Sequence, residues 1–174
     1  MNLNKFIAKR NNIVFYTSND IGVKPILSKI NEDMNFYNNA DIEDTVVGKA
    51  AACLYVLAKI KFVYAHTLSE PAKIYLEKNN IAFKYDKLVK EIRNKTNTEM
   101  CPLEKSVIHI EDPVTAKIAL DNTIKELMNQ KKSQVFIYLD LAFEYISKKI
   151  SKKKDPAASY LRRGKPNYCR RESA

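Results

Sequence analysis

The chain has 174 residues, of which 45% are hydrophobic, enough for one compact domain with an appendage. Residues 1–130 hold 18 basic and 16 acidic residues, a net charge of +2, whereas residues 131–174 hold 12 and 4, a net charge of +8. A basic chain often binds nucleic acid, but this charge distribution marks a basic C-terminal tail and not a basic globular face.

The cysteine pattern and the apolar runs indicate a cytoplasmic protein without a membrane partner. Three cysteines, an odd number without a Cys-x-x-Cys spacing, argue against a disulfide scaffold and for a reducing compartment. Residues 1–12 are too polar for a secretory signal. The longest apolar run, residues 50–58, is about half of the roughly 20 residues that a membrane span requires.

The N-terminal third predicts a strand and a short helix before a long buried helix. Residues 13–17 are rich in β-branched and aromatic side chains, and residues 23–30 form a helix with a proline in its first turn. The acidic residues of 41–44 are typical of a helix start, and the apolar run 46–60 predicts a helix buried on all sides. Gly48 inside it indicates that another group approaches the backbone closely.

The middle of the chain alternates between strand and helix patterns. Residues 62–66 predict a strand, and Leu68-Ser-Glu-Pro starts a helix that ends at Lys78. Residues 81–85 predict another strand, followed by Asp86 as the N-cap of a helix over 87–93. Strands and helices at this spacing are typical of a parallel α/β layer.

The C-terminal part predicts helices and a tail. A short helix begins at Cys101-Pro102, a second begins after Asp112 and runs to about residue 130, and residues 133–150 favour an amphipathic helix. The aperiodic, basic end of the chain predicts disorder. The expected organisation is an α/β domain over 1–130, a helical extension over 131–151 and a basic tail over 152–174.

Zinc-dependent deamination of nucleobases is excluded by the motifs. That chemistry needs His-x-Glu at one helix start and Pro-Cys-x-x-Cys at the next. Here His66 is followed by Thr67 and Leu68, and no cysteine pair exists. We therefore expect no metal and no cofactor.

Four sequence blocks resemble a small prokaryotic family of unknown function with a cytidine deaminase-like fold that lacks the zinc motif. The blocks are Gly-Val-Lys-Pro within residues 22–27, Val-Val-Gly-Lys-Ala-Ala-Ala within 40–52, Ser-Glu-Pro-Ala within 64–72 and Met-Cys-Pro-Leu-Glu within 100–105. The resemblance covers roughly residues 13–127. It implies a three-layer α/β/α sandwich and no named reaction.

In such a fold the starts of the two central helices point at one cleft, and converging helix N-termini suit an anionic ligand. The residues expected at this cleft are Asp44, Gly48, Lys49, Thr67, Ser69 and Glu70. The alternative is that the acidic and hydroxyl groups only cap their own helices. Lys49 favours function, because an ammonium inside an apolar helix needs an anion, and we expect it to pair with Glu70 or Asp44.

Cys101 is a second candidate. Cys101-Pro-Leu-Glu104 fits a capping box, and a helix N-terminus favours the reactive thiolate form of cysteine. The thiol is therefore either a nucleophile or a weak structural cap.

Two classes of function remain open at this stage. The first is an enzyme that uses Cys101, Lys49 and Glu70 as catalytic residues on a nucleotide-like or phosphorylated substrate, with Asp44, Gly48, Thr67, Ser69 and Glu104 binding the ligand. The second is a noncatalytic regulatory domain that holds a small anionic ligand, or a protein that associates weakly with nucleic acid through its tail. An oligomer is compatible with either class.

Overall fold

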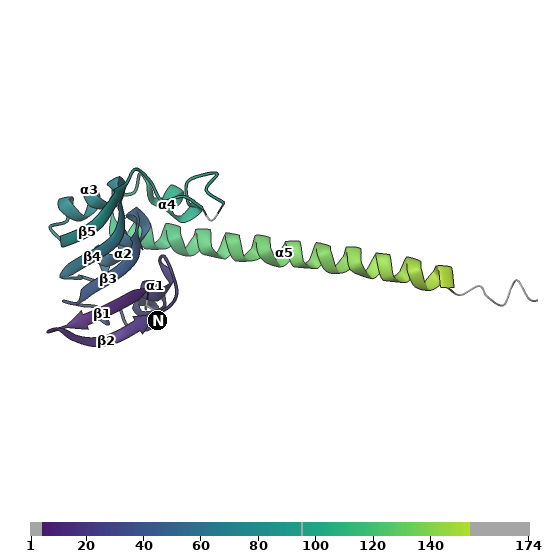
Figure 1. Ribbon diagram of the computed structural model, residues 1–174, viewed down its shortest axis with the longest axis horizontal. Coiled ribbons are helices and arrows are strands. Elements are labelled where there is room, and N and C mark those ends of the chain that lie inside the picture. Colours follow the sequence, from purple (N-terminus) through teal and green to yellow (C-terminus); the bar gives the residue numbers. More distant parts are fainter. Residues whose placement is uncertain (1–4, 95, 154–174) are drawn as a thin grey trace, which may run out of the picture. The chain divides into compact units, whose positions relative to one another are not determined.

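The computed structural model describes residues 5–94 and 96–153, with side chains described through residue 149 (Figure 1). The chain divides into two compact units, with the boundary in the sequence after Leu127. The elements, in chain order, are β1 (Phe6–Arg10), β2 (Ile13–Ser18), α1 (Lys24–Glu32), β3 (Asp41–Val47), α2 (Lys49–Leu57), β4 (Phe62–Ser69), α3 (Glu70–Lys78), β5 (Ala82–Val89), α4 (Pro102–Val107) and α5 (Pro113–Lys153).

The first unit is built on one mixed sheet of five strands in the order β2-β1-β3-β4-β5 (Figure 1). β1 runs antiparallel to both β2 and β3, while β3, β4 and β5 are parallel. α2 connects β3 to β4, and α3 connects β4 to β5. The predicted α/β class and its parallel layer are confirmed. The parallel register brings the ends of β3 and β4, and hence the starts of α2 and α3, to the same edge of the sheet.

Strand β1 was not expected from the sequence. It forms a hairpin with β2 through Asn11 and Asn12, whose φ angles are 51° and 63°. Two consecutive residues with positive φ suit the two-residue turns that join antiparallel strands, and asparagine tolerates this conformation. The Asn-Asn pair was therefore the signal for a hairpin, and the polar residues around Phe6-Ile7-Ala8 hid the strand.

The predicted acidic helix start at residues 41–44 is wrong. These residues belong to β3, and α2 begins only at Lys49. Ile42, Asp44 and Val47 are buried, and β3 pairs with β1 on one side and with β4 on the other. The ladder hydrogen bonds on both sides decide the conformation, so the predicted helix start is a central strand, and the helix itself covers only Lys49–Leu57.

The predicted helix over 87–93 is also wrong, because β5 continues to Val89 and residues 90–93 are not helical. Asp86 does not cap a helix. Its carboxylate instead accepts hydrogen bonds from the Tyr64 hydroxyl and pairs with Nδ1 of His66 at 2.7 Å. Pairing of β5 with β4 along its length explains the extended strand.

The hydrophobic core covers one face of the sheet. Phe6, Ala8, Ile42, Val63 and Ala65 point inward at alternate strand positions and are fully or almost fully buried. The helices α1, α2 and α3 pack side by side in this core, together with the first turns of α5. The helix α2 is the most enclosed, as its apolar sequence predicts.

The opposite face of the sheet carries polar and aromatic side chains that stay partly exposed. Lys9, Glu43, Tyr64 and His66 alternate with the buried positions on β1, β3 and β4. No second helical layer lies over these side chains among the described residues. The predicted three-layer α/β/α sandwich is therefore not confirmed.

The predicted helices at the C-terminal side are present. The carboxylate of Asp112 accepts a hydrogen bond from the Thr115 amide at 2.8 Å, which confirms the predicted cap of α5. The two helices expected over residues 112–130 and 133–150 form one helix. In the second unit, the large apolar side chains between Val135 and Ile146 are exposed.

Within the described residues, no helix is long and apolar enough to cross a membrane. Residues 154–174 of the predicted tail lie outside the described range.

Asp44 makes the stability of the domain depend on pH. Its carboxylate is buried between β3 and α2 and accepts a hydrogen bond of 2.6 Å from the Tyr55 hydroxyl. Burial raises its pKa to about 6, with the Tyr55 bond opposing the shift. Because the folded state holds this proton more tightly than the unfolded chain, the group stabilises the fold at low pH, and this contribution is lost as pH rises toward 6.

We expect Asp44→Asn to remove this pH dependence. Between pH 4 and pH 7, the free energy of unfolding of the variant should shift relative to wild type by about 2 kcal/mol in favour of the variant. Urea unfolding at several pH values measures this difference, with Asp20→Asn at an exposed position as the control. A difference between variant and wild type that stays constant with pH would contradict the assignment.

Candidate functional site

The start of α2 is closed by a carboxylate from a distant part of the chain. Glu104, on α4, accepts hydrogen bonds from the amide of Lys49 at 2.6 Å and from the amide of Ala50 at 3.1 Å. Only 6% of Glu104 is exposed. Burial raises its pKa, and the bonds from Ala50 and Lys49 oppose that shift. The first amides of a helix lack partners within the helix, and here the protein supplies them with its own anion.

Gly48 is required by this contact. It is the N-cap of α2, and a Cβ atom at this position would overlap the Glu104 carboxylate. The close approach that the sequence predicted at Gly48 is therefore confirmed, and the approaching group is a side chain of the same protein. The backbone conformation of Gly48 itself is extended, so space and not φ selects glycine.

The predicted capping box of Cys101 and Glu104 is wrong. The Cys101 side chain makes no cap hydrogen bond with α4, and Glu104 contacts the backbone of α2 instead of the N-cap of its own helix. The local spacing fits a capping box, but the unpaired amides of α2 compete successfully for the carboxylate. Glu104 thereby fastens α4 to the start of α2.

The second helix start behaves as the sequence predicted. Ser69 is the N-cap of α3, and its hydroxyl accepts a hydrogen bond from the Ala72 amide at 3.3 Å. Glu70 follows in the first turn and is exposed, while Thr67 lies half-buried in β4. Ser69 thus caps an amide of its own helix, as the alternative interpretation of these residues predicted.

Lys49 has different partners from those predicted. Its ammonium group donates hydrogen bonds to the Ile108 carbonyl at 2.7 Å and to Oε1 of Glu111 at 3.1 Å, and it pairs with neither Glu70 nor Asp44. The Lys49 side chain is only 5% exposed, and a buried ammonium requires an anionic partner. Glu111 is that partner. The Tyr75 ring also lies below the ammonium, 5.4 Å from the ring centroid.

The Lys49 ammonium faces a cavity of about 230 Å³, here called the Lys49 pocket. It is lined by Lys49, Pro71, Ile74, Tyr75, Lys78, Ile108 and Glu111. Glu111 bridges two cations, because its second carboxylate oxygen lies 2.7 Å from the ammonium of Lys78. Lys78 and then Lys49 hold the pKa of Glu111 below its ordinary value. Glu111 therefore stays ionised at neutral pH.

Sequence reasoning found Lys49 but missed Tyr75, Lys78 and Glu111. Tyr75 and Lys78 are three residues apart on α3 and hence neighbours on one helix surface, which was a readable signal. The Tyr75 hydroxyl donates to the Glu111 carbonyl at 2.7 Å. Glu111 immediately precedes the cap of α5, and no spacing in the sequence connects it to Lys49.

The two described cysteines lie in different environments. Cys53, one turn after Lys49 on α2, is fully buried, and burial raises the pKa of its thiol to about 11, so it stays protonated at neutral pH. Cys101 is partly exposed before α4. None of the contacts described for Cys101 joins its thiol to Lys49 or Glu70. The catalytic role of Cys101, Lys49 and Glu70 stays a prediction.

This arrangement defines an α/β domain with a lysine-containing pocket between α3, the start of α2 and the segment before α5. Residues 2–124 match the family TM1506, described as a domain of unknown function (DUF1893), and the chain belongs to that family. The fold is similar to the crystal structure, at 2.70 Å resolution, of a DUF1893 family protein (TM1506) from Thermotoga maritima. That structure shares 26% identity and has a TM-score of 0.60, with 71% of this chain and 80% of that chain covered. No curated protein matches the chain.

Gly48→Ala should destabilise the domain only while Glu104 is present. In the wild-type background the added methyl group displaces the carboxylate, and we expect a loss of about 2 kcal/mol in the free energy of unfolding. In a Glu104→Ala background the same change should cost less than about 1 kcal/mol, because the overlap is gone. Chemical unfolding of the two single variants and the double variant measures this coupling. Additive losses would show that Gly48 is selected for another reason.

Alkylation kinetics test whether Cys101 is a nucleophile. If its thiol is activated, it should react with iodoacetamide at pH 7 several times faster than the thiol of free N-acetylcysteine. A Cys169→Ser variant isolates the signal, and buried Cys53 serves as the slow internal control. Reaction of Cys101 no faster than the free thiol would leave it a structural residue.

Proposed function

We propose that this protein is a deaminase-like α/β domain without zinc that binds a small anionic ligand in the Lys49 pocket. The proposal keeps the predicted class of ligand and moves the site from the helix starts, which Glu104 and Ser69 already satisfy, to the adjacent cavity. One observation carries it. Two ammonium groups, those of Lys49 and Lys78, share the single carboxylate of Glu111 at a cavity large enough for a phosphate-sized ion.

The charges of the pocket favour a second anion. Lys49 and Lys78 bring two positive charges, and Glu111 compensates one of them. The Lys49 side chain is almost completely buried, and charge interactions are stronger in the protein interior than in water. The side chain of Glu111, by contrast, is 55% exposed. An incoming anion can therefore replace the Glu111 carboxylate on Lys49 while Glu111 moves into solvent and Lys78 remains as a second contact.

The rest of the lining limits what fits. Pro71, Ile74 and the Tyr75 ring make the walls largely apolar, so the polar contacts are concentrated at the lysine end. A cavity of about 230 Å³ is below the 300–1,000 Å³ typical of drug-sized ligands. These properties support a small phosphate, sulfate or carboxylate compound in preference to a large metabolite.

Whether the bound compound is converted is a separate proposal. An enzyme would use Cys101, Lys49 and Glu70, and a regulatory domain would only hold the anion. Binding without conversion is supported by the pocket lining, which includes Lys49 and does not include Cys101. Nucleic-acid association through the tail concerns residues outside the described range and stays a prediction.

A thermal-shift titration with phosphate, pyrophosphate and sulfate tests the anion pocket. A ligand at about 100 times its Kd stabilises a domain by about 2.7 kcal/mol, so the unfolding temperature should rise by several degrees and then saturate. Lys49→Met and Lys78→Met should abolish the saturable rise. Lys73→Met, which removes a lysine from the same helix α3 outside the pocket, is the matched control and should keep it.

Circular dichroism of each variant without ligand separates loss of binding from loss of folding. A rise of equal size in wild type and in folded Lys49→Met would identify a general salt effect and contradict the proposal.

A further inference from the structure

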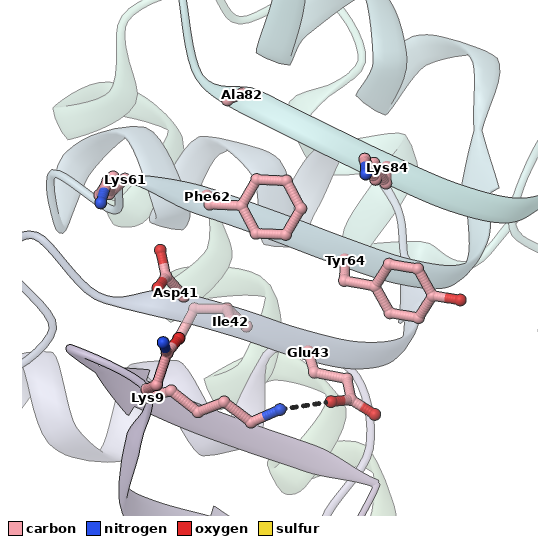
Figure 2. A pocket seen from close by; sticks show the side chains of 10 residues that line it. Lys9, Asp41, Ile42, Glu43, Lys61, Phe62, Tyr64, Ala82 and Lys84 are labelled. Atoms are coloured by element: carbon pink, nitrogen blue, oxygen red, sulfur yellow. Dashed lines mark hydrogen bonds and ion pairs between the residues drawn. The ribbon is translucent and has the colours of Figure 1, made fainter.

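The partly exposed face of the sheet contains a second and larger depression, of about 650 Å³, here called the sheet pocket (Figure 2). It lies across β1, β3, β4 and β5 and shares no residue with the Lys49 pocket. Its lining residues are Lys9, Asn12, Asp41, Ile42, Glu43, Lys61, Phe62, Tyr64, Ala82 and Lys84. The volume is in the range of small-molecule sites.

Two aromatic rings form the floor of the sheet pocket. Phe62 and Tyr64 are two positions apart on β4, so they project from the same face of the sheet. Figure 2 shows both rings with their flat faces toward the viewer, lying over the strands. Ala82, which pairs with Phe62 across the β4–β5 ladder, is small and leaves the ring open on that side. An aromatic face that is open to solvent can stack on a flat ligand ring.

Charged groups surround these rings. Lys61 lies beside Phe62 in sequence, and Lys84 pairs with Tyr64 in the ladder between β4 and β5. Within the described residues, neither ammonium group forms an ion pair. Lys9, by contrast, is paired with Glu43 at 3.0 Å, the contact drawn in Figure 2. Figure 2 shows these two cations at opposite ends of the Phe62 ring, with Lys61 near Asp41 and Lys84 on β5.

Asp41 adds an acceptor to the same surface. It is half-buried at the start of β3, opposite Phe62 in the β3–β4 ladder. It forms no ion pair with any described residue. The sheet pocket therefore combines a stacking surface, an ammonium group at each end, and a carboxylate that can accept hydrogen bonds from amino groups.

We infer that the sheet pocket binds a free mononucleotide, with its base stacked on Phe62 and its phosphate held by Lys84. A nucleobase supplies the flat ring and, in adenine, guanine or cytosine, an amino group for Asp41. A simple anion would leave the rings unused, and an apolar ligand would leave the lysines unpaired. The net charge of only +2 over residues 1–130 does not favour a polyanion such as single-stranded nucleic acid.

Calorimetric titration of the full chain with AMP, GMP, CMP and UMP tests this inference. At least one of these nucleotides should bind, and Phe62→Leu should weaken that binding about fivefold or more, the range found for loss of base stacking. Tyr85→Leu removes an aromatic ring from β5 outside the pocket and should leave the Kd unchanged. Unfolding curves of both variants confirm that they are folded.

The phosphate contact has its own matched pair. Lys84→Ala should weaken nucleotide binding several-fold and reduce its salt dependence, whereas Lys87→Ala on the same strand should not. Adenosine without phosphate and ribose 5-phosphate without a base should each bind more weakly than AMP. Lys73→Met, which changes a lysine outside both pockets, should bind nucleotides like wild type.

Three outcomes would overturn the inference. They are the absence of binding for all four nucleotides at millimolar concentration, binding that Phe62→Leu leaves unchanged, and binding of a short single-stranded oligonucleotide without binding of any mononucleotide.

Discussion

The contact between the Glu104 carboxylate and the first amides of α2 is the constraint on which the rest of the site depends. It joins residues more than fifty positions apart in the chain, because Glu104 reaches the amides of Lys49 and Ala50. It fixes α4 against α2, requires glycine at position 48 and fills the place where a helix N-terminus could hold an external anion. The two charge-assisted hydrogen bonds offset the free-energy cost of removing the carboxylate from water.

This constraint also explains where an anion can still bind. The start of α2 is closed by Glu104 and the start of α3 by Ser69, and the Lys49 ammonium pairs with Glu111, which Lys78 also contacts. Lys49 leaves the helix start and reaches the segment before α5, where it meets the Ile108 carbonyl and Glu111. Two ammonium groups share one exposed carboxylate, so this small cavity favours anionic ligands, which its apolar walls alone would not.

Local signals in the sequence were sufficient for the helices that have their own caps. Ser69-Glu-Pro and Asp112-Pro113 each define a helix start through nearby atoms, and both were predicted. Residues 41–47 were misinterpreted because acidic residues before an apolar run fit a helix start equally well. Only pairing with β1 and β4 makes them a strand. Similarly, Gly48 and Lys49 stood out in the sequence, but their partners come from segments too distant for any spacing rule.

Amide hydrogen exchange at Lys49 and Ala50 tests the role of Glu104 most directly. These amides occupy the first turn of α2, where no intrahelical carbonyl can protect them. We predict that both exchange slowly in the native wild-type protein and that Glu104→Ala accelerates their exchange selectively, while amides in the middle of α2 stay protected. Rapid exchange of Lys49 and Ala50 in wild type, or equal protection with and without the Glu104 carboxylate, would contradict the view that this side chain closes the helix.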